Sequence, residues 1–148
     1  MHKYSVKITW IPQGEPYHRK GILSAPGLKD IVVVTPPEFK HGIPNEWTPE
    51  HLFIASVFVC TMTTFLAISE ASKLEYEHFH IETTGFLDDI EVDGRKQPQI
   101  TEINQKFHIK LKSKNDEMKT RKILEKTERD CLIANSMKSK VTLEPIFK

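Results

Sequence analysis

The chain lacks the basic excess of many nucleic-acid-binding proteins and the many cysteines of small secreted proteins. Its 21 Lys and Arg residues nearly balance its 20 Asp and Glu residues, so the formal net charge at pH 7 is only +1. A chain without a basic excess gives no argument for a nucleic-acid partner. It has only two cysteines, Cys60 and Cys131, which lie 71 positions apart and exclude the disulfide-rich scaffolds of small secreted proteins.

The chain also lacks a clear membrane or export signal. The uncharged run from Leu52 to Ile68 is shorter than the ~20 residues of a membrane span and contains four Ser or Thr residues. Residues 1–7 alternate charged and apolar side chains, unlike a signal peptide with its apolar core. We therefore expect one domain over residues 1–148, with no membrane partner, in the cytoplasm, where the two thiols are free or redox-active.

Alternating apolar and polar residues predict an antiparallel meander in the first part of the chain. Its strands are expected over residues 2–10, 17–24 and 30–35, with turns at 11–16 and at Pro26-Gly27. Arg19 falls within the second of these strands. A proline-containing loop over residues 36–47 follows, and connections of this length are often functional.

The residues after this loop predict a long helix of about 24 residues. Thr48 can cap it, Pro49 suits the first helical position, and Glu50 in the first turn complements the helix dipole. Apolar groups fall all round this helix, which predicts that it is buried. Cys60 lies at its middle.

The remaining chain predicts two strands, a helix and a last strand, which makes the fold α+β. The ranges are strands over 76–87 and 100–111, a polar segment over 88–98 with an Asp93-Gly94 turn, a helix over 117–131, and a strand within 140–147. The second helix has one apolar stripe and ends at Cys131. If this stripe packs on the first helix, the two sulfurs can approach each other.

The two cysteines leave two interpretations open. A buried cysteine often behaves as a small inert hydrophobe. Alternatively, one thiolate attacks a peroxide and the other thiol resolves the sulfenic acid, which requires a cation that lowers the thiol pKa. The chain has only four arginines, and Arg19 is the only one before the first helix.

Glu50 is too far along the helix to serve its own Cys60. Ten residues of α-helix span about 15 Å, which a glutamate side chain cannot cross. If Glu50 and an arginine support a Cys60 thiolate, either they come from a second chain or the helix is broken. On this condition we expect a dimer with a composite site.

No metal or cofactor site is predicted. His78 and His80 share one strand face, but no third ligand stands at a recognisable spacing, so we expect an ordinary exposed strand face. The sequence contains no glycine-rich phosphate loop, nucleophile elbow or HExxH motif.

The segment Trp47-Thr48-Pro49-Glu50-His51-Leu52, with Cys60 ten residues after Glu50, resembles the PE-and-cysteine helix of the OsmC/Ohr family of osmotically induced and organic hydroperoxide resistance proteins. The segments Arg19-Lys20-Gly21, Cys131 to Ser136 and Val141-Thr142-Leu143 resemble further parts of that family. Leu132 stands where the family usually has a proline, and residues 36–42 replace the glycine-rich loop of the Ohr branch. The chain is therefore most similar to the general OsmC-like branch.

This resemblance implies an α+β fold with two long central helices, flanked by antiparallel sheets, in an intertwined homodimer. It implies a thiol-dependent peroxidase for organic hydroperoxides, in which an external thiol or dithiol is the reductant and no cofactor is bound. Cys60 would be the peroxidatic thiol and Cys131 the resolving thiol. Arg19 would stabilise the thiolate, and Glu50 would orient Arg19.

Two alternatives to the peroxidase remain open. One is a non-enzymatic dimer that binds a small apolar ligand and has inert thiols. The other is a different thiol-based transferase or hydrolase, which would need a base that the sequence does not clearly offer.

Overall fold

The structure is a computed structural model that describes residues 1–12 and 17–148, so most of the turn predicted at 11–16 lies outside the described residues. The chain forms two compact units, which we call the first unit (Met1–Phe53) and the second unit (Ile54–Lys148). The single domain over 1–148 stays a prediction.

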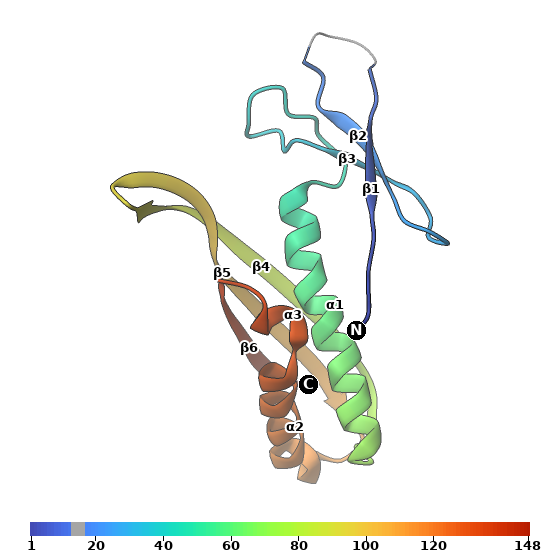
Figure 1. Ribbon diagram of the computed structural model, residues 1–148. Coiled ribbons are helices and arrows are strands. Elements are labelled where there is room, and N and C mark those ends of the chain that lie inside the picture. The colour runs from blue at the N-terminus through green and yellow to red at the C-terminus, as the bar shows by residue number, and fades with distance from the viewer. Residues whose placement is uncertain (13–16) are drawn as a thin grey trace. The chain divides into compact units, whose positions relative to one another are not determined.

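The first unit contains the predicted antiparallel meander. Strands β1 (Lys7–Trp10), β2 (Lys20–Ser24) and β3 (Ile31–Val34) form a three-stranded sheet in that order (Figure 1). The prediction of a strand from residue 2 was wrong, because the ladder with β2 begins where Lys7 pairs with Ser24. Arg19 lies immediately before β2 rather than inside the strand.

The long helix α1 (Pro49–Ala71) begins at a signal that is visible in the sequence and ends before a residue in the left-handed conformation. The backbone N–H of His51 donates to the Thr48 hydroxyl at 3.3 Å, which is the predicted cap. At the other end Lys73 adopts a left-handed conformation (φ 51°), and the N–H of Leu74 donates to the carbonyl of Ser69 at 2.9 Å. This is the Schellman arrangement that closes a helix.

The prediction that α1 is buried on all sides was wrong. Its buried residues recur every four positions and form one stripe: Val57, Thr61, Phe65 and Ser69. Apolar side chains on other faces are exposed, among them Val59 (48%) and Leu66 (40%). The reason is that a single chain supplies packing partners for only one face of the helix.

By length and composition alone α1 could cross a membrane, and only 22% of its apolar window is buried. The core helix of a soluble protein meets the same criterion.

The second unit is built on a mixed sheet, which corrects the expectation of purely antiparallel sheets. Strands β4 (Tyr76–Val92) and β5 (Arg95–Leu111) are antiparallel, and β6 (Lys140–Phe147) pairs with β5 in parallel. The segment 88–98, predicted as a polar connection, is instead the end of the β4–β5 hairpin. Asp93 (φ 51°) and Gly94 (φ 74°) form the predicted turn, and their positive φ values suit a two-residue hairpin loop.

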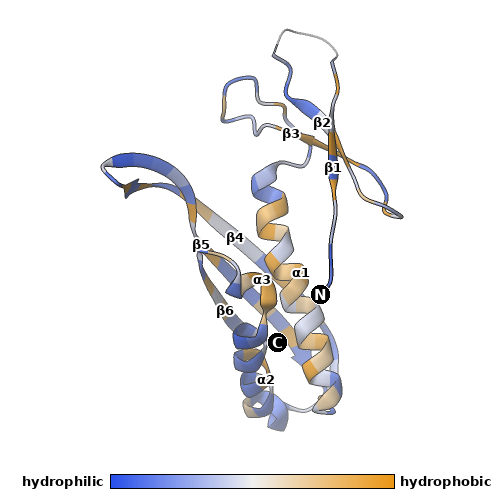
Figure 2. Cartoon of the chain, in the orientation of Figure 1, coloured by the Kyte–Doolittle hydropathy of each residue, from blue (hydrophilic) through white to orange (hydrophobic). Residues whose placement is uncertain are grey.

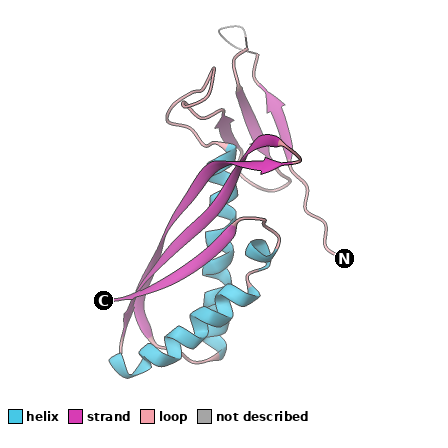
Figure 3. Ribbon diagram, turned by 90° about the vertical axis from the view of Figure 1, so that its left-hand side faces the viewer, coloured by secondary structure: helices cyan, strands magenta, loops and turns pink. Residues whose placement is uncertain are grey.

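Helices α1 and α2 pack on one face of this sheet (Figure 3). α2 (Glu117–Asp130) follows a short 3₁₀ turn (Lys114–Asp116), and α3 (Leu132–Asn135) follows Cys131. The main core joins Phe65 of α1, Phe107 of β5 and Ile123 of α2. At 14 residues against 23, α2 is much shorter than α1, and Figure 2 shows that it is mostly hydrophilic. The expectation of two long helices therefore holds for α1 only.

Candidate functional site

The two cysteines meet in a small apolar cluster of the second unit. Cys131 is 1% exposed and packs with Val57 and Ile103, and the half-buried Cys60 lies against this cluster. A hydrogen bond joins the two cysteine side chains, so the predicted approach of the sulfurs is present in the structure. Both cysteines are free thiols.

Helix α1 and the break between α2 and α3 place these sulfurs. Cys60 lies one turn before Thr64, whose hydroxyl is 3.9 Å from the sulfur. The prediction that α2 runs to Cys131 was one residue too long, because Cys131 has an extended backbone (φ −69°, ψ 100°) and α3 begins at Leu132. The backbone N–H groups of Leu132 and Ile133 therefore face the Cys60 sulfur.

Donors around Cys60 favour its thiolate. Burial by itself would raise the pKa of Cys60, but it is outweighed by hydrogen bonds from the backbone N–H of Ile133, the Cys131 thiol, the Thr64 hydroxyl and the backbone N–H of Leu132. The net effect is that the pKa of Cys60 lies below its usual value of 9.0. A proline at position 132 would have no N–H to donate.

Cys131 is shifted in the opposite direction. Burial raises the pKa of the Cys131 thiol above 9.0, and the neighbouring Cys60 raises it further. A hydrogen bond from the backbone of Ala134 opposes these effects without cancelling them. Of the two thiols, Cys60 therefore ionises more readily than Cys131.

The other two predicted site residues, Arg19 and Glu50, belong to the first unit. Arg19 is exposed and takes part in no ion pair among the described residues. Oxygen Oε2 of Glu50 is shielded from solvent and has no hydrogen-bond partner within the described part of the chain. Because α1 is continuous, the ten residues between Glu50 and Cys60 still correspond to about 15 Å.

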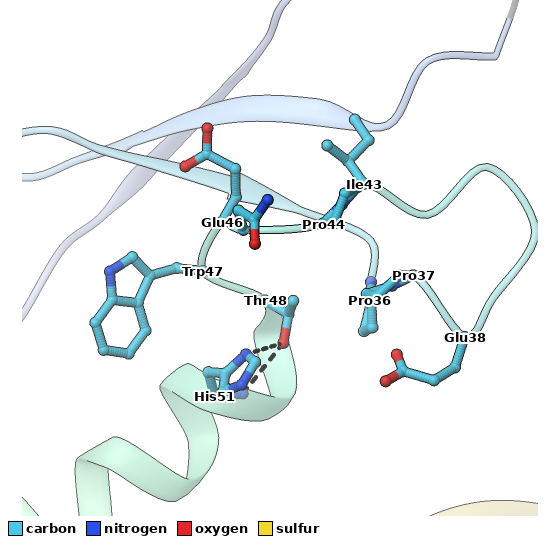
Figure 4. Close-up of a pocket in the computed structure, with 10 residues that line it drawn as sticks. Pro36, Pro37, Glu38, Ile43, Pro44, Glu46, Trp47, Thr48 and His51 are labelled. Atoms are coloured by element: carbon cyan, nitrogen blue, oxygen red, sulfur yellow. Dashed lines mark hydrogen bonds between the residues drawn. The ribbon is translucent and has the colours of Figure 1, made fainter.

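The proline-containing loop before α1 forms a cavity of about 590 Å³ in the first unit (Figure 4). Glu38, Trp47 and His51 are among its lining residues. The sequence analysis missed His51, although it directly follows the Pro-Glu pair. Its Nδ1 lies 2.8 Å from the Thr48 hydroxyl, and its ring meets Trp47 edge-on at 6.2 Å.

A separate group of possible metal ligands lies in the second unit. His80 and Glu82 of β4 and His108 of β5 bring their ligand atoms within 4.8 Å of one another. The sequence offered no third ligand at a recognisable spacing, whereas the structure brings Glu82 and His108 beside His80. The expectation of an ordinary exposed strand face stays a prediction. The third ligand comes from a neighbouring strand 28 positions away, so no local spacing in the sequence reveals it.

A family model described as OsmC-like protein matches residues 41–145. No protein in a search of curated proteins matches the chain.

Solved structures share the fold over nearly the whole chain. An OsmC-like protein of unknown function from Vibrio cholerae is 22% identical, with a TM-score of 0.86 and coverage of 99% of this chain and 100% of that one. An organic hydroperoxide resistance protein OsmC from Legionella pneumophila is 16% identical, with a TM-score of 0.70 and coverage of 100% and 98%. The organic hydroperoxide resistance protein OhrB of Bacillus subtilis is 18% identical, with a TM-score of 0.64 and coverage of 99% and 98%.

At these identities the structural likeness establishes the shared α+β fold. The family match, which spans well over half of the sequence, goes further. The chain belongs to the OsmC-like protein family.

Proposed function

We propose that this protein is a thiol-dependent peroxidase that reduces organic hydroperoxides in the cytoplasm as part of an oxidative stress response. One observation carries the proposal: the two thiols lie in one cluster, where surrounding donors lower the pKa of Cys60 and burial raises that of Cys131. A peroxidatic cysteine needs thiolate character, and a second thiol beside it can condense with the sulfenic acid that forms. Family relatives named as organic hydroperoxide resistance proteins support the substrate class.

The two cysteines account for one reduction of a hydroperoxide, and an external reductant closes the cycle. The Cys60 thiolate attacks the terminal oxygen of the hydroperoxide, the O–O bond breaks, and the alkoxide leaves as an alcohol after taking a proton. Cys60 is then a sulfenic acid. The Cys131 thiol attacks this sulfur, a disulfide forms, and water leaves. An external thiol or dithiol reduces the disulfide and restores both thiols.

Arg19 and Glu50 complete the site in this proposal, as the thiolate-stabilising cation and the group that orients it. The shielded Glu50 oxygen supports such a role, because a shielded carboxylate oxygen without a partner is costly unless a cation or donor reaches it. The separation of about 15 Å along α1 is too long for this carboxylate to reach its own Cys60, so it would serve a Cys60 of another chain.

A homodimer would supply that second chain. The exposed apolar side chains of α1, including Val59 and Leu66, give the surface that a second copy would cover. The active site would then be shared between the two subunits.

Intact-mass analysis after one equivalent of an alkyl hydroperoxide tests the thiol chemistry. We expect the wild type to lose about 2 Da as the disulfide forms, and Cys131→Ser to gain about 16 Da or more as Cys60 is oxidised. Peroxide consumption by Cys60→Ser at the wild-type rate, or no mass change in the wild type, would contradict the proposal.

The cavity of about 590 Å³ favours one second candidate function, a dimer that binds a small apolar ligand and has inert thiols. The alkylation of Cys60 against pH separates the two. A thiol that titrates at or above its usual value and is unreactive at neutral pH supports binding alone, whereas a reactive Cys60 supports the peroxidase.

A further inference from the structure

We propose that His80, Glu82 and His108 form a binding site for a divalent transition metal ion of the Zn²⁺ type on the outer face of the β4–β5 hairpin. This inference does not depend on the proposed peroxidase function. It rests on residues of the second unit alone.

The strand register brings the two imidazoles together. His80 of β4 is directly opposite His108 of β5, and Glu82 stands two residues further along β4 on the same face. Side chains that are directly opposite on antiparallel strands start about 4.5–5.5 Å apart, which is close enough to share one ligand. The three residues therefore converge because of the sheet, not because of sequence spacing.

The distances between Glu82 and the two histidines fit a shared metal ion, and the ligand atoms of all three residues lie within 4.8 Å of one another. The Nε2 atom of His108 is 3.3 Å from one Glu82 oxygen, and the Nε2 atom of His80 is 4.0 Å from the other. Metal–ligand distances of about 2.0–2.2 Å in a tetrahedral site place neighbouring ligand atoms roughly 3.3 Å apart. The His108–Glu82 pair already has this separation, and the His80–Glu82 pair must close by less than 1 Å.

The imidazole rings need one rotation before both can bind. They stack nearly parallel, with centroids 4.5 Å apart and planes 6° apart, so their in-plane lone pairs do not yet converge. The His80 side chain is 47% exposed and that of Glu82 is 65% exposed, so both are free to turn. The torsion that turns an imidazole is broad, so the rotation costs little.

The chemistry of the ligand set selects the metal. Two imidazoles and one carboxylate suit Zn²⁺ and similar ions better than Mg²⁺, which prefers oxygen ligands. Three protein ligands leave the fourth position for water, which can enter because the site is exposed.

The site is separate from the thiols. The histidines alternate along their strands with Phe79, Ile81 and Phe107, which face the core. A metal ion on the outer face is therefore on the opposite side of the sheet from the helices, where it would link β4 to β5.

Calorimetric titration with ZnCl₂ tests the proposal. Thiolates also bind zinc, so the titrations use a Cys60→Ser/Cys131→Ser background. We expect one Zn²⁺ per chain in this background. The substitutions His108→Gln and Glu82→Gln should each weaken binding by about 10-fold or more.

His78→Gln is the matched control, because His78 lies on the same face of β4 but pairs with Lys110. Its affinity should stay within about twofold of the background, below the loss expected for a ligand. The melting temperature should rise with ZnCl₂ and not with MgCl₂ in the background and in His78→Gln only. No saturable binding, unchanged affinity in His108→Gln, or an equal loss in His78→Gln would overturn the assignment.

Discussion

Replacing Cys131 by alanine should make Cys60 less reactive, although Cys131 is not itself the nucleophile. In the folded chain the Cys131 thiol donates a hydrogen bond that favours the Cys60 thiolate. Cys131→Ala removes this donor, so the pKa of Cys60 should rise. At a pH below that pKa, the thiolate fraction and the alkylation rate should both fall.

The size of the effect follows from the strength of one hydrogen bond to a charged group, about 1.5–3 kcal/mol. The lower end applies, because S–H is a weak donor and the Ile133 and Leu132 N–H groups remain. Since 1.4 kcal/mol corresponds to a factor of ten, alkylation of Cys60 at neutral pH should slow by about tenfold. At high pH, where Cys60 is ionised in both the wild type and Cys131→Ala, the two alkylation rates should converge.

The assay is iodoacetamide alkylation followed by intact mass across a pH series. Cys131→Ser is the matched control, because its hydroxyl keeps a donor at the same position. We expect the serine variant to alkylate faster than the alanine variant at neutral pH. Equal rates, or a faster alanine variant, would refute the idea that this donor stabilises the thiolate.

Four further outcomes test the packing and the site. Phe65→Ala should lower the free energy of unfolding by about 3–5 kcal/mol in urea titrations, because this ring is fully buried against three other aromatic rings. Gly85→Ala should cost about 1–3 kcal/mol, since its Cβ would lie 2.5 Å from Cδ1 of Ile54, and Ile54→Val should restore part of this loss. Leu132→Pro should fold normally, because the position is the first of α3 and follows an extended residue, yet it should slow Cys60 alkylation by removing one N–H donor. Leu66→Glu should shift the proposed homodimer toward monomer in light scattering without changing the helical circular dichroism, and a fully dimeric variant would count against α1 as the interface.

Local signals in the sequence predicted most of the elements correctly. Thr48, Pro49 and Glu50 mark the start of α1, because capping depends on residues within one turn. The Asp93-Gly94 turn was visible for the same reason, since positive φ values select particular residues. The family resemblance was carried by motifs of this kind, and the match over residues 41–145 confirms it.

Contacts between distant parts of the chain determine the features that local sequence patterns did not predict. The parallel pairing of β6 with β5 depends on how α2 and α3 return the chain, and no local pattern encodes it. His108 lies opposite His80 only because the hairpin sets the register.

The same distinction between local sequence and tertiary contacts applies to the candidate site. The sequence by itself identified Cys60 and Cys131 and placed them on or beside two helices. Only the tertiary structure decided that α3 begins just after Cys131, so that N–H groups of Leu132 and Ile133 reach Cys60. A side chain's identity is local, but its pKa depends on burial and on donors that folding brings from elsewhere in the chain.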